Sequence, residues 1–163
     1  MKNGPWVIVA LGSNRGNSRQ NVLNAVQRLA AFSDHPPLVS SLWETTPVDC
    51  PSGSPAFINA VMAFRPRRAE TPESLLVEFQ AIEREYGRRP KQVLNEPRPL
   101  DLDLIAFGPE TRSKPELTIP HPRAHLREFV LGPLNEIAPD LVLPGQELSV
   151  KALLERLRSS RSR

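Results

Sequence analysis

The chain has 163 residues, a formal net charge of +3 and a hydrophobic content of 39%. This length suits one ordinary domain with its own core, so we expect a single domain over residues 1–163. The single cysteine, Cys50, excludes an internal disulfide and is typical of a protein from a reducing compartment. The apolar run Trp6–Leu11 is too short for a signal peptide or a membrane span, so we expect a cytoplasmic protein with no membrane partner.

The first part of the chain predicts a strand, a helix and a second strand. Trp6–Leu11 is a continuous apolar run that meets Gly12, which indicates a buried strand followed by a turn. A helix follows, with Asn17 or Ser18 as its N-cap. Its apolar residues recur at three- and four-residue steps: Val22, Ala25, Val26, Leu29 and Ala30. After two prolines, residues 39–45 alternate in polarity and predict a second strand.

The middle of the chain predicts a third strand, a second helix and a fourth strand. After a loop with proline and glycine at 47–55, Phe57–Phe64 has the composition of a half-buried strand. Thr71 begins a helix with a hydroxyl cap, a proline at the first helical position and an acid in the first turn. Gly87 ends that helix. A long loop then leads to the fourth strand, Leu100–Phe107.

After the fourth strand, prolines recur at positions 120, 122, 133 and 139, so we expect only short helices there. A last amphipathic helix follows. That helix carries its apolar residues on one side: Val150, Leu153, Leu154 and Leu157. The element order is therefore β-α-β-β-α-β, followed by a C-terminal extension and helix. This order predicts an α+β fold of the ferredoxin-like type, with two helices on one side of a sheet that contains antiparallel pairs.

Two carboxylates in the fourth strand are the clearest candidates for chemistry. In Asp101-Leu102-Asp103, alternation places both acids on one face and the leucines on the other. Two acids this close repel each other unless a cation lies between them. Carboxylate oxygens suit Mg²⁺, which shares its remaining positions with water and phosphates. The alternative is a strand end with two solvated acids.

A basic loop precedes these acids and would bring cations to them. Arg98 lies three residues upstream of Asp101, and Arg88, Arg89 and Lys91 belong to the same loop. A site for a polyphosphate needs metal ions and guanidinium groups together, because both neutralise charge that develops during transfer. A solvated loop without such a role would also be basic, so this pattern leaves both interpretations open.

A histidine and an aromatic–amide pair are further candidates. His121 lies between two prolines, and Arg127 and Phe129 follow within eight residues, which fits a ligand site or a structural histidine. Phe57 and Asn59 share one strand face by alternation. They could stack on a flat heterocycle and hydrogen-bond to it, although roles in the core and at the strand edge would explain them as well.

Together these segments resemble the 6-hydroxymethyl-7,8-dihydropterin pyrophosphokinases, the pterin-activating kinases of folate synthesis. The most specific segment is Pro97–Ile105, which is similar to the family signature of Pro-Arg, two residues and Asp-x-Asp followed by aliphatics. Further segments that are similar to the family follow in chain order: Ala10–Asn14, Glu44–Pro47, Phe57–Ala60, Gln80–Glu83, Ile119–Pro122, Arg127–Leu134 and Glu136–Pro139.

The resemblance implies a reaction and a set of roles. A Mg²⁺-dependent diphosphotransferase would move a diphosphate from ATP to the hydroxymethyl group of the dihydropterin and release AMP. Asp101 and Asp103 would bind two Mg²⁺ and would be catalytic residues together with Arg88 and Arg98. The pterin-binding residues would be Thr45, Val48, Phe57, Asn59 and Phe129. The ATP-binding residues would be Gln80, Glu83, Arg98, Leu104, Thr118, His121 and Arg127.

Two other functions remain as alternatives. A ferredoxin-like RNA-binding module without catalysis would fit the basic charge, but it needs exposed sheet aromatics in an RNP-type pattern, which the sequence lacks. We therefore expect no nucleic-acid partner. A different Asp-x-Asp nucleotidyl or phosphoryl transferase would release pyrophosphate or ADP in place of AMP. We expect a monomer whose partners are ATP and 6-hydroxymethyl-7,8-dihydropterin.

Overall fold

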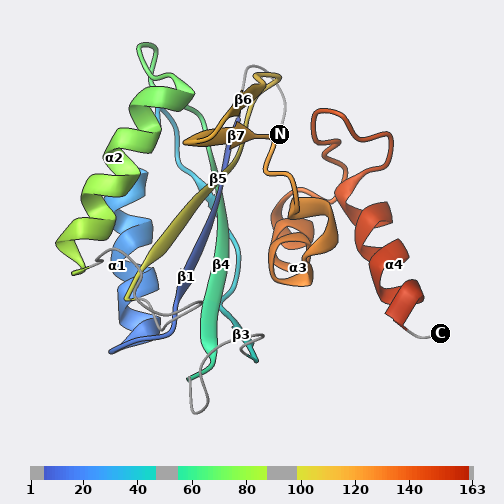
Figure 1. Cartoon of the computed structure of the whole chain (residues 1–163), viewed down its shortest axis with the longest axis horizontal. Coiled ribbons are helices and arrows are strands. Elements are labelled where there is room, and N and C mark those ends of the chain that lie inside the picture. The colour runs from blue at the N-terminus through green and yellow to red at the C-terminus, as the bar shows by residue number, and fades with distance from the viewer. Residues whose placement is uncertain (1–5, 47–54, 88–98, 162–163) are drawn as a thin grey trace.

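A computed structural model of the chain describes residues 6–46, 55–87 and 99–161. Its strands are β1 (Val7–Ser13), β2 (Leu38–Val39), β3 (Trp43–Thr45), β4 (Phe57–Phe64), β5 (Asp101–Phe107), β6 (Arg112–Lys114) and β7 (Leu117–Ile119). Its helices are α1 (Ser18–Ala30), α2 (Pro72–Glu85), the 3-10 helix η1 (Ala124–Leu126), α3 (Glu128–Ile137) and α4 (Val150–Arg161). Figure 1 shows the elements around a central sheet.

The central sheet is antiparallel in all its described pairs and has β1 in its interior. β1 pairs with β4 on one side and with β5 on the other. The order is β2-β4-β1-β5, and β3 also pairs with β4, next to β2 along the same edge. β6 and β7 form a separate hairpin. An α+β fold with an antiparallel sheet is therefore confirmed.

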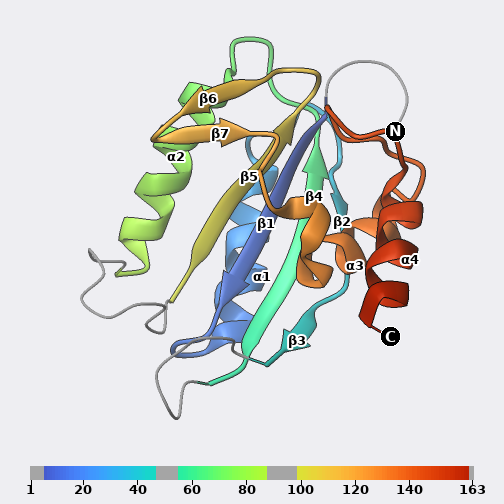
Figure 2. The same cartoon turned by 45° about the vertical axis from the view of Figure 1, so that its right-hand side comes forward.

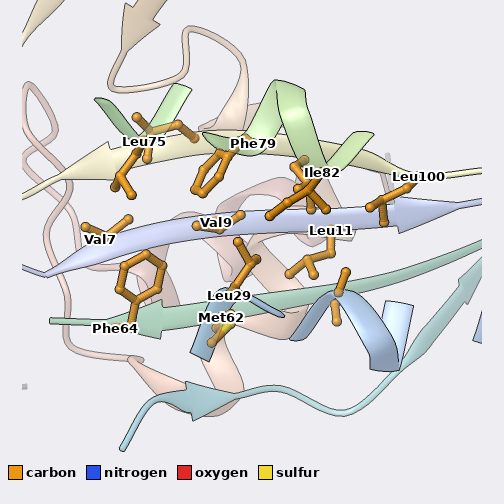
Figure 3. Close-up of a cluster of buried hydrophobic side chains, with 14 of the residues drawn as sticks. Val7, Val9, Leu11, Leu29, Met62, Phe64, Leu75, Phe79, Ile82 and Leu100 are labelled. Carbon is orange, nitrogen blue, oxygen red and sulfur yellow. The ribbon is translucent and has the colours of Figure 1, made fainter. Parts of the chain in front are cut away.

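Helices cover both faces of the central sheet. Both α1 and α2 lie on one face, as predicted, whereas α3 and α4 lie on the other (Figures 1 and 2). The core under α1 and α2 includes Val7, Val9 and Leu11 of β1, which Figure 3 shows beside side chains of α2. The core under α3 and α4 includes Ile8 and Ala10. The sequence predicted short helices for the C-terminal extension but did not predict that they cover the second face.

The predicted starts of α1 and α2 and the predicted end of α2 are confirmed. The Asn17 side chain accepts a hydrogen bond from the Gln20 N–H at 3.3 Å and so caps α1. At the start of α2, Thr71 accepts from the Ser74 N–H at 3.0 Å, and the Ser74 hydroxyl accepts from the Thr71 N–H at 2.9 Å. Gly87 follows α2 with a φ of +83°, a backbone conformation that glycine adopts without strain. Within the described ranges, no helix combines the length and apolar character needed to cross a bilayer.

The prediction of one continuous strand over residues 39–45 is wrong. The Ser40 hydroxyl accepts from the Val61 N–H at 2.9 Å, and so occupies a position that a strand backbone would take. The next N–H, that of Ser41, leaves the sheet and donates to Glu136 of α3 at 2.8 Å. The pairing is therefore interrupted between β2 and β3. The β6–β7 hairpin was not predicted from the sequence.

Candidate active site

The floor of the candidate site is a row of three residues across the sheet. Gly12 of β1 pairs with Asn59 of β4 and with Asp101 of β5, and directly paired residues of an antiparallel sheet point to the same face. A Cβ on Gly12 would lie 3.2 Å from Asn59 Oδ1 and 3.8 Å from Phe57 Cδ1. Because glycine has no side chain, the face stays open between the amide and the carboxylate.

Asp103 lies on the same face, two residues along β5. It pairs with Ala10 of β1, and both aspartates are half-buried. Their neighbours Leu102 and Leu104 are buried in the core under α1 and α2. The predicted alternation is therefore confirmed. It also shows that the Leu104 side chain, which the sequence placed near the nucleotide, lies on the opposite face from the acids.

Thr45 and Phe57 extend this face beyond the row. They pair with each other between β3 and β4, and Asn59 Nδ2 donates to Thr45 Oγ1 at 2.7 Å. Asn59 is 6% exposed, so its amide is held in one orientation with Oδ1 toward Gly12. The aromatic ring, the amide and the hydroxyl predicted to bind a pterin are therefore neighbours on one face.

His121 lies beside the outer edge of β5. Its backbone N–H donates to the Ile105 carbonyl at 2.8 Å, and the Nδ1 atom of its imidazole accepts from the backbone N–H of Arg123 at 3.1 Å. Burial lowers the pKa of His121, and the charges of Arg127 and Arg123 lower it further, whereas Asp101 acts in the opposite direction. The imidazole is therefore neutral at pH 7, and with Nδ1 as an acceptor, Nε2 carries the hydrogen and can donate.

Arg127 and Phe129 stand together at the start of α3. The guanidinium carbon of Arg127 lies 5.4 Å from the centre of the Phe129 ring, a cation–π distance. Phe129 is 36% exposed, which is unusual for a large aromatic side chain in a helix that packs on a sheet. Arg127, which was predicted to bind ATP, and Phe129, which was predicted to bind the pterin, are therefore in direct contact.

The remaining predicted nucleotide residues are more dispersed. Glu83 of α2 is buried, and its Oε2 accepts from the Leu102 N–H at 2.8 Å, so this carboxylate holds the backbone of β5 beside the acids. Gln80 is exposed on α2. Thr118 is exposed on β7 and donates to the Lys114 carbonyl at 3.1 Å. Three further predicted residues, Val48, Arg88 and Arg98, lie outside the described residues.

Two supporting residues were missed by the sequence analysis. Ser13 Oγ donates to the Pro99 carbonyl at 2.6 Å, and Asn21 Nδ2 donates to the same oxygen at 3.1 Å. These bonds fix the chain two residues before Asp101. Gly12 was predicted only as the start of a turn. A glycine that continues the alternation of a strand could have indicated a close approach by another group.

The acids fit a metal ion that takes only part of its coordination from protein. Among the described residues, no group of three or more His, Cys, Asp or Glu side chains could hold a metal by itself. Asp101 and Asp103 offer two carboxylates on one open face. Mg²⁺ is commonly bound by one or two carboxylates together with water and substrate phosphates, so this donor set suits Mg²⁺ better than a metal that needs a complete protein cage.

A cavity of about 410 Å³ lies next to this site, between the start of α1 and the end of α2. Its described lining residues are Arg15, Gly16, Asn17, Asn21, Tyr86, Gly87 and Pro99. None of them is a predicted site residue. Among its described lining residues, Pro99 is the one that leads into β5 and the acids.

The family of the chain follows from its sequence relatives. Residues 8–139 match the family model of 7,8-dihydro-6-hydroxymethylpterin-pyrophosphokinase, HPPK. The chain belongs to the HPPK family. The matched region contains all the residues predicted for the site, from Thr45 to Phe129.

Several HPPK relatives are similar over most of the chain. The 2-amino-4-hydroxy-6-hydroxymethyldihydropteridine pyrophosphokinase of Pseudomonas aeruginosa is 41% identical over 142 residues, which is 85% of this chain and 83% of the relative. The protein of the same name from Haemophilus influenzae is 38% identical over 141 residues and 86% of each chain. The folic acid synthesis protein fol1 of Pneumocystis carinii is 38% identical over 151 residues, but the chain spans only 20% of its length.

Solved structures agree on the fold. The Plasmodium falciparum HPPK-DHPS wild type with SDX-DHP superposes with a TM-score of 0.74, covering 97% of this chain and 45% of that chain. The same wild-type protein in another crystal structure gives 0.73. Sequence identity is 14% and 13%. These likenesses therefore establish the arrangement of the helices and strands, and the chain spans less than half of each of these solved chains.

Proposed function

We propose that this HPPK chain transfers a diphosphate from ATP to 6-hydroxymethyl-7,8-dihydropterin in folate synthesis, with Mg²⁺ bound at Asp101 and Asp103. One observation carries the proposal. The two acids lie on the same open sheet face as Phe57 and Asn59, and only Gly12 separates Asp101 from Asn59. A flat ring at the aromatic–amide end would thus have its substituent close to the acidic end.

The reaction needs positioning and charge neutralisation more than a protein nucleophile. The hydroxymethyl oxygen attacks the β-phosphorus of ATP, forms a new O–P bond and gives up its proton to solvent. The bond from that phosphorus to the oxygen bridging to the α-phosphate breaks, and AMP leaves with the electron pair. Asp101 and Asp103 would hold Mg²⁺, which would supply neutralisation of the phosphate charge.

The chain's own residues would hold the two substrates for this step. Phe57 and Phe129 would stack on the pterin, and Asn59, oriented by Thr45, would hydrogen-bond to its edge. Neutral His121 would donate from Nε2 to a phosphate oxygen, and Arg127 would add a fixed positive charge. We also propose phosphate contacts for Arg88 and Arg98, a pterin contact for Val48, and nucleotide contacts for Gln80 and Thr118. Leu104 and Glu83 have buried side chains, so they would take part through the backbone of β5, which Leu104 belongs to and Glu83 holds in place.

A product assay tests this function directly. Purified protein is incubated with ATP, Mg²⁺ and the hydroxymethyl-dihydropterin, and the products are separated by HPLC. The proposal predicts AMP and pterin diphosphate in equal amounts, and no product when EDTA replaces Mg²⁺. Formation of ADP or pyrophosphate, or no nucleotide turnover, would contradict it.

The RNA-binding alternative is not favoured by family or fold. RNA-binding sheets of this kind stack bases on an open face. Here α3 packs on β3 and β4 and, together with α4, covers part of that face (Figure 2). Salt-sensitive RNA binding without nucleotide turnover would revive this alternative.

The finer expectations about architecture remain predictions. The order β2-β4-β1-β5, with α1 and α2 on one face, supports a ferredoxin-like topology. A single pyrophosphokinase domain, a monomeric state and a cytoplasmic location are likewise proposed. Light scattering after gel filtration tests the oligomeric state.

A further inference from the structure

Glu136 of α3 binds the segment that connects β2 to β3. Its Oε1 accepts from the Ser41 N–H at 2.8 Å, and its two carboxylate oxygens lie 3.0 and 2.8 Å from the Ser41 hydroxyl. Its Oε2 also accepts from the Trp43 indole N–H at 3.3 Å. One carboxylate therefore holds three donors, and hydrogen bonds to a charged acceptor are the stronger kind.

Trp43 also packs directly on α3 at Gly132. A Cβ on Gly132 would lie 2.5 Å from the indole Cη2 atom and 2.6 Å from Cζ3, so the ring rests on the helix backbone. Gly132 and Glu136 are four residues apart and share one face of α3. That face receives the ring of Trp43 at one point and binds its N–H at the other.

These contacts fix how β3 lies along α3. Glu136 meets Ser41, and Gly132, one turn earlier in the helix, meets Trp43. The segment from Ser41 and the helix therefore run in opposite directions. The next residue of β3 on the Trp43 face is Thr45, and the next residue on this face of the helix is Phe129. If this register continues, Phe129 is the residue of α3 that we expect nearest to Thr45.

Thr45 is part of the opposite wall of the pterin site. It pairs with Phe57 and accepts the hydrogen bond from Asn59. Glu136 and Gly132 contact Trp43, which lies two residues before Thr45 in β3. Their contact would therefore determine the distance between Phe129 and the Thr45–Phe57 pair.

We propose that Glu136 is a positioning residue which, through Trp43 and Gly132, sets the width of the pterin slot between Phe57 and Phe129. This inference rests on the proposed function. Without the carboxylate, β3 and α3 lose their fixed register, so stacking on the pterin weakens. Of the residues proposed for the nucleotide, only Arg127 lies at α3, so we expect ATP binding to change much less than pterin binding.

Kinetics of three variants test this role. In Glu136→Ala, we expect the KM for the pterin to rise about tenfold, because small misplacements of positioning groups have effects of this order. The KM for ATP should change much less, and the kcat at saturating pterin should stay close to the parent value. Glu136→Gln keeps one acceptor oxygen and restores most of the pterin affinity. Gly132→Ala displaces Trp43 and reproduces the pattern of Glu136→Ala. Glu155→Ala, an exposed glutamate on α4, is the matched control.

Tryptophan emission supplies a readout independent of turnover. The chain has two tryptophans, so a Trp6→Phe background leaves Trp43 as the only emitter. We expect Glu136→Ala and Gly132→Ala to shift Trp43 emission to longer wavelength while circular dichroism shows that both variants remain folded at the assay temperature.

The outcomes separate this inference from the function on which it rests. A parent protein that forms no AMP and pterin diphosphate overturns the proposed function and the positioning role with it. An active parent whose Glu136→Ala variant shows equal changes in both KM values, no change in either, or unshifted Trp43 emission overturns the positioning role alone.

Discussion

The two faces of the central sheet differ most at the end of β1. On the face under α1 and α2, apolar side chains continue to Leu11, which pairs with Leu102, and only the last residue of β1, Ser13, is polar. On the opposite face the apolar side chains stop earlier, and Gly12 lies between Asn59 and Asp101. The same three strands thus build a core on one side and a polar, open surface on the other.

This difference separates stability from chemistry. The apolar face stabilises the fold in proportion to the surface that it removes from water. The polar face holds two acids close together, and carboxylates this close repel each other. At this end of the sheet, substitutions on the apolar face should therefore change the free energy of unfolding, and those on the polar face should change catalysis.

The largest expected effect is on the polar face. Replacing Asp101 or Asp103 by asparagine should lower kcat by about a hundred- to a thousandfold, because a group that stabilises transition-state charge is lost. The melting temperature should stay close to that of the parent. Steady-state assays and thermal melts check this, with Asp140→Asn, an exposed acid outside the site, as the control. A variant that loses stability but keeps its kcat would contradict the assignment of these two acids to catalysis.

The apolar face should show the reverse pattern. Leu29 of α1 is fully buried, so Leu29→Ala should lower the free energy of unfolding by about 2–5 kcal/mol. The kcat measured well below the melting temperature should be unchanged. Urea denaturation gives the stability, and Leu23→Ala, at a 46% exposed position on the same helix, is the matched control. Equal losses in the two variants would be inconsistent with this assignment of the core.

Gly12 tests the boundary between the faces. Its new Cβ in Gly12→Ala would lie 3.2 Å from Asn59 Oδ1, closer than an ordinary van der Waals contact, so the amide must move. We expect the KM for the pterin to rise about tenfold, since the amide reads the edge of that ring. The KM for ATP should change much less. If both rise together, Gly12 does not act through Asn59.

The smallest effect concerns a surface pair on the helix side. Glu73 of α2 binds Arg112 of β6 at 2.6 Å, and this hydrogen bond lowers the pKa of Glu73 from 4.5 to about 2. A carboxyl whose pKa is lower in the folded state stabilises it above pH 4.5, and this contribution disappears as the pH falls toward 2. Chemical denaturation of the parent and Glu73→Gln should therefore differ slightly at pH 6 and converge near pH 2. If the difference in free energy of unfolding between the two proteins grew as the pH fell, the pair would not stabilise the fold in the way that its lowered pKa predicts.

Local patterns predicted much of this molecule. The Thr71 cap acts over three residues, and the alternation of Asp101 and Asp103 has a period of two, so both can be found in a short window of sequence. The resemblance to HPPK then assigned roles that no single segment could establish. His121, for example, fitted a ligand site or a structural role from its own segment, and its assignment to ATP binding is still a prediction that rests on the resemblance.

What the sequence did not predict depends on distant partners. The break between β2 and β3 requires Glu136, which is 95 residues from Ser41 along the chain. The importance of Gly12 appears only when both of its neighbouring strands are in register. Such features follow from the tertiary fold, because propensity and periodicity carry no information about which segments meet.

The central claim is that Asp101 and Asp103 bind the cations that hold the nucleotide. Isothermal titration calorimetry with a non-hydrolysable ATP analogue tests it most directly, with Mg²⁺ or with EDTA, on the parent and on the Asp101→Asn, Asp103→Asn double variant. The account predicts that Mg²⁺ strengthens binding to the parent strongly and has little effect on the variant. Equal strengthening by Mg²⁺ in both proteins would contradict it.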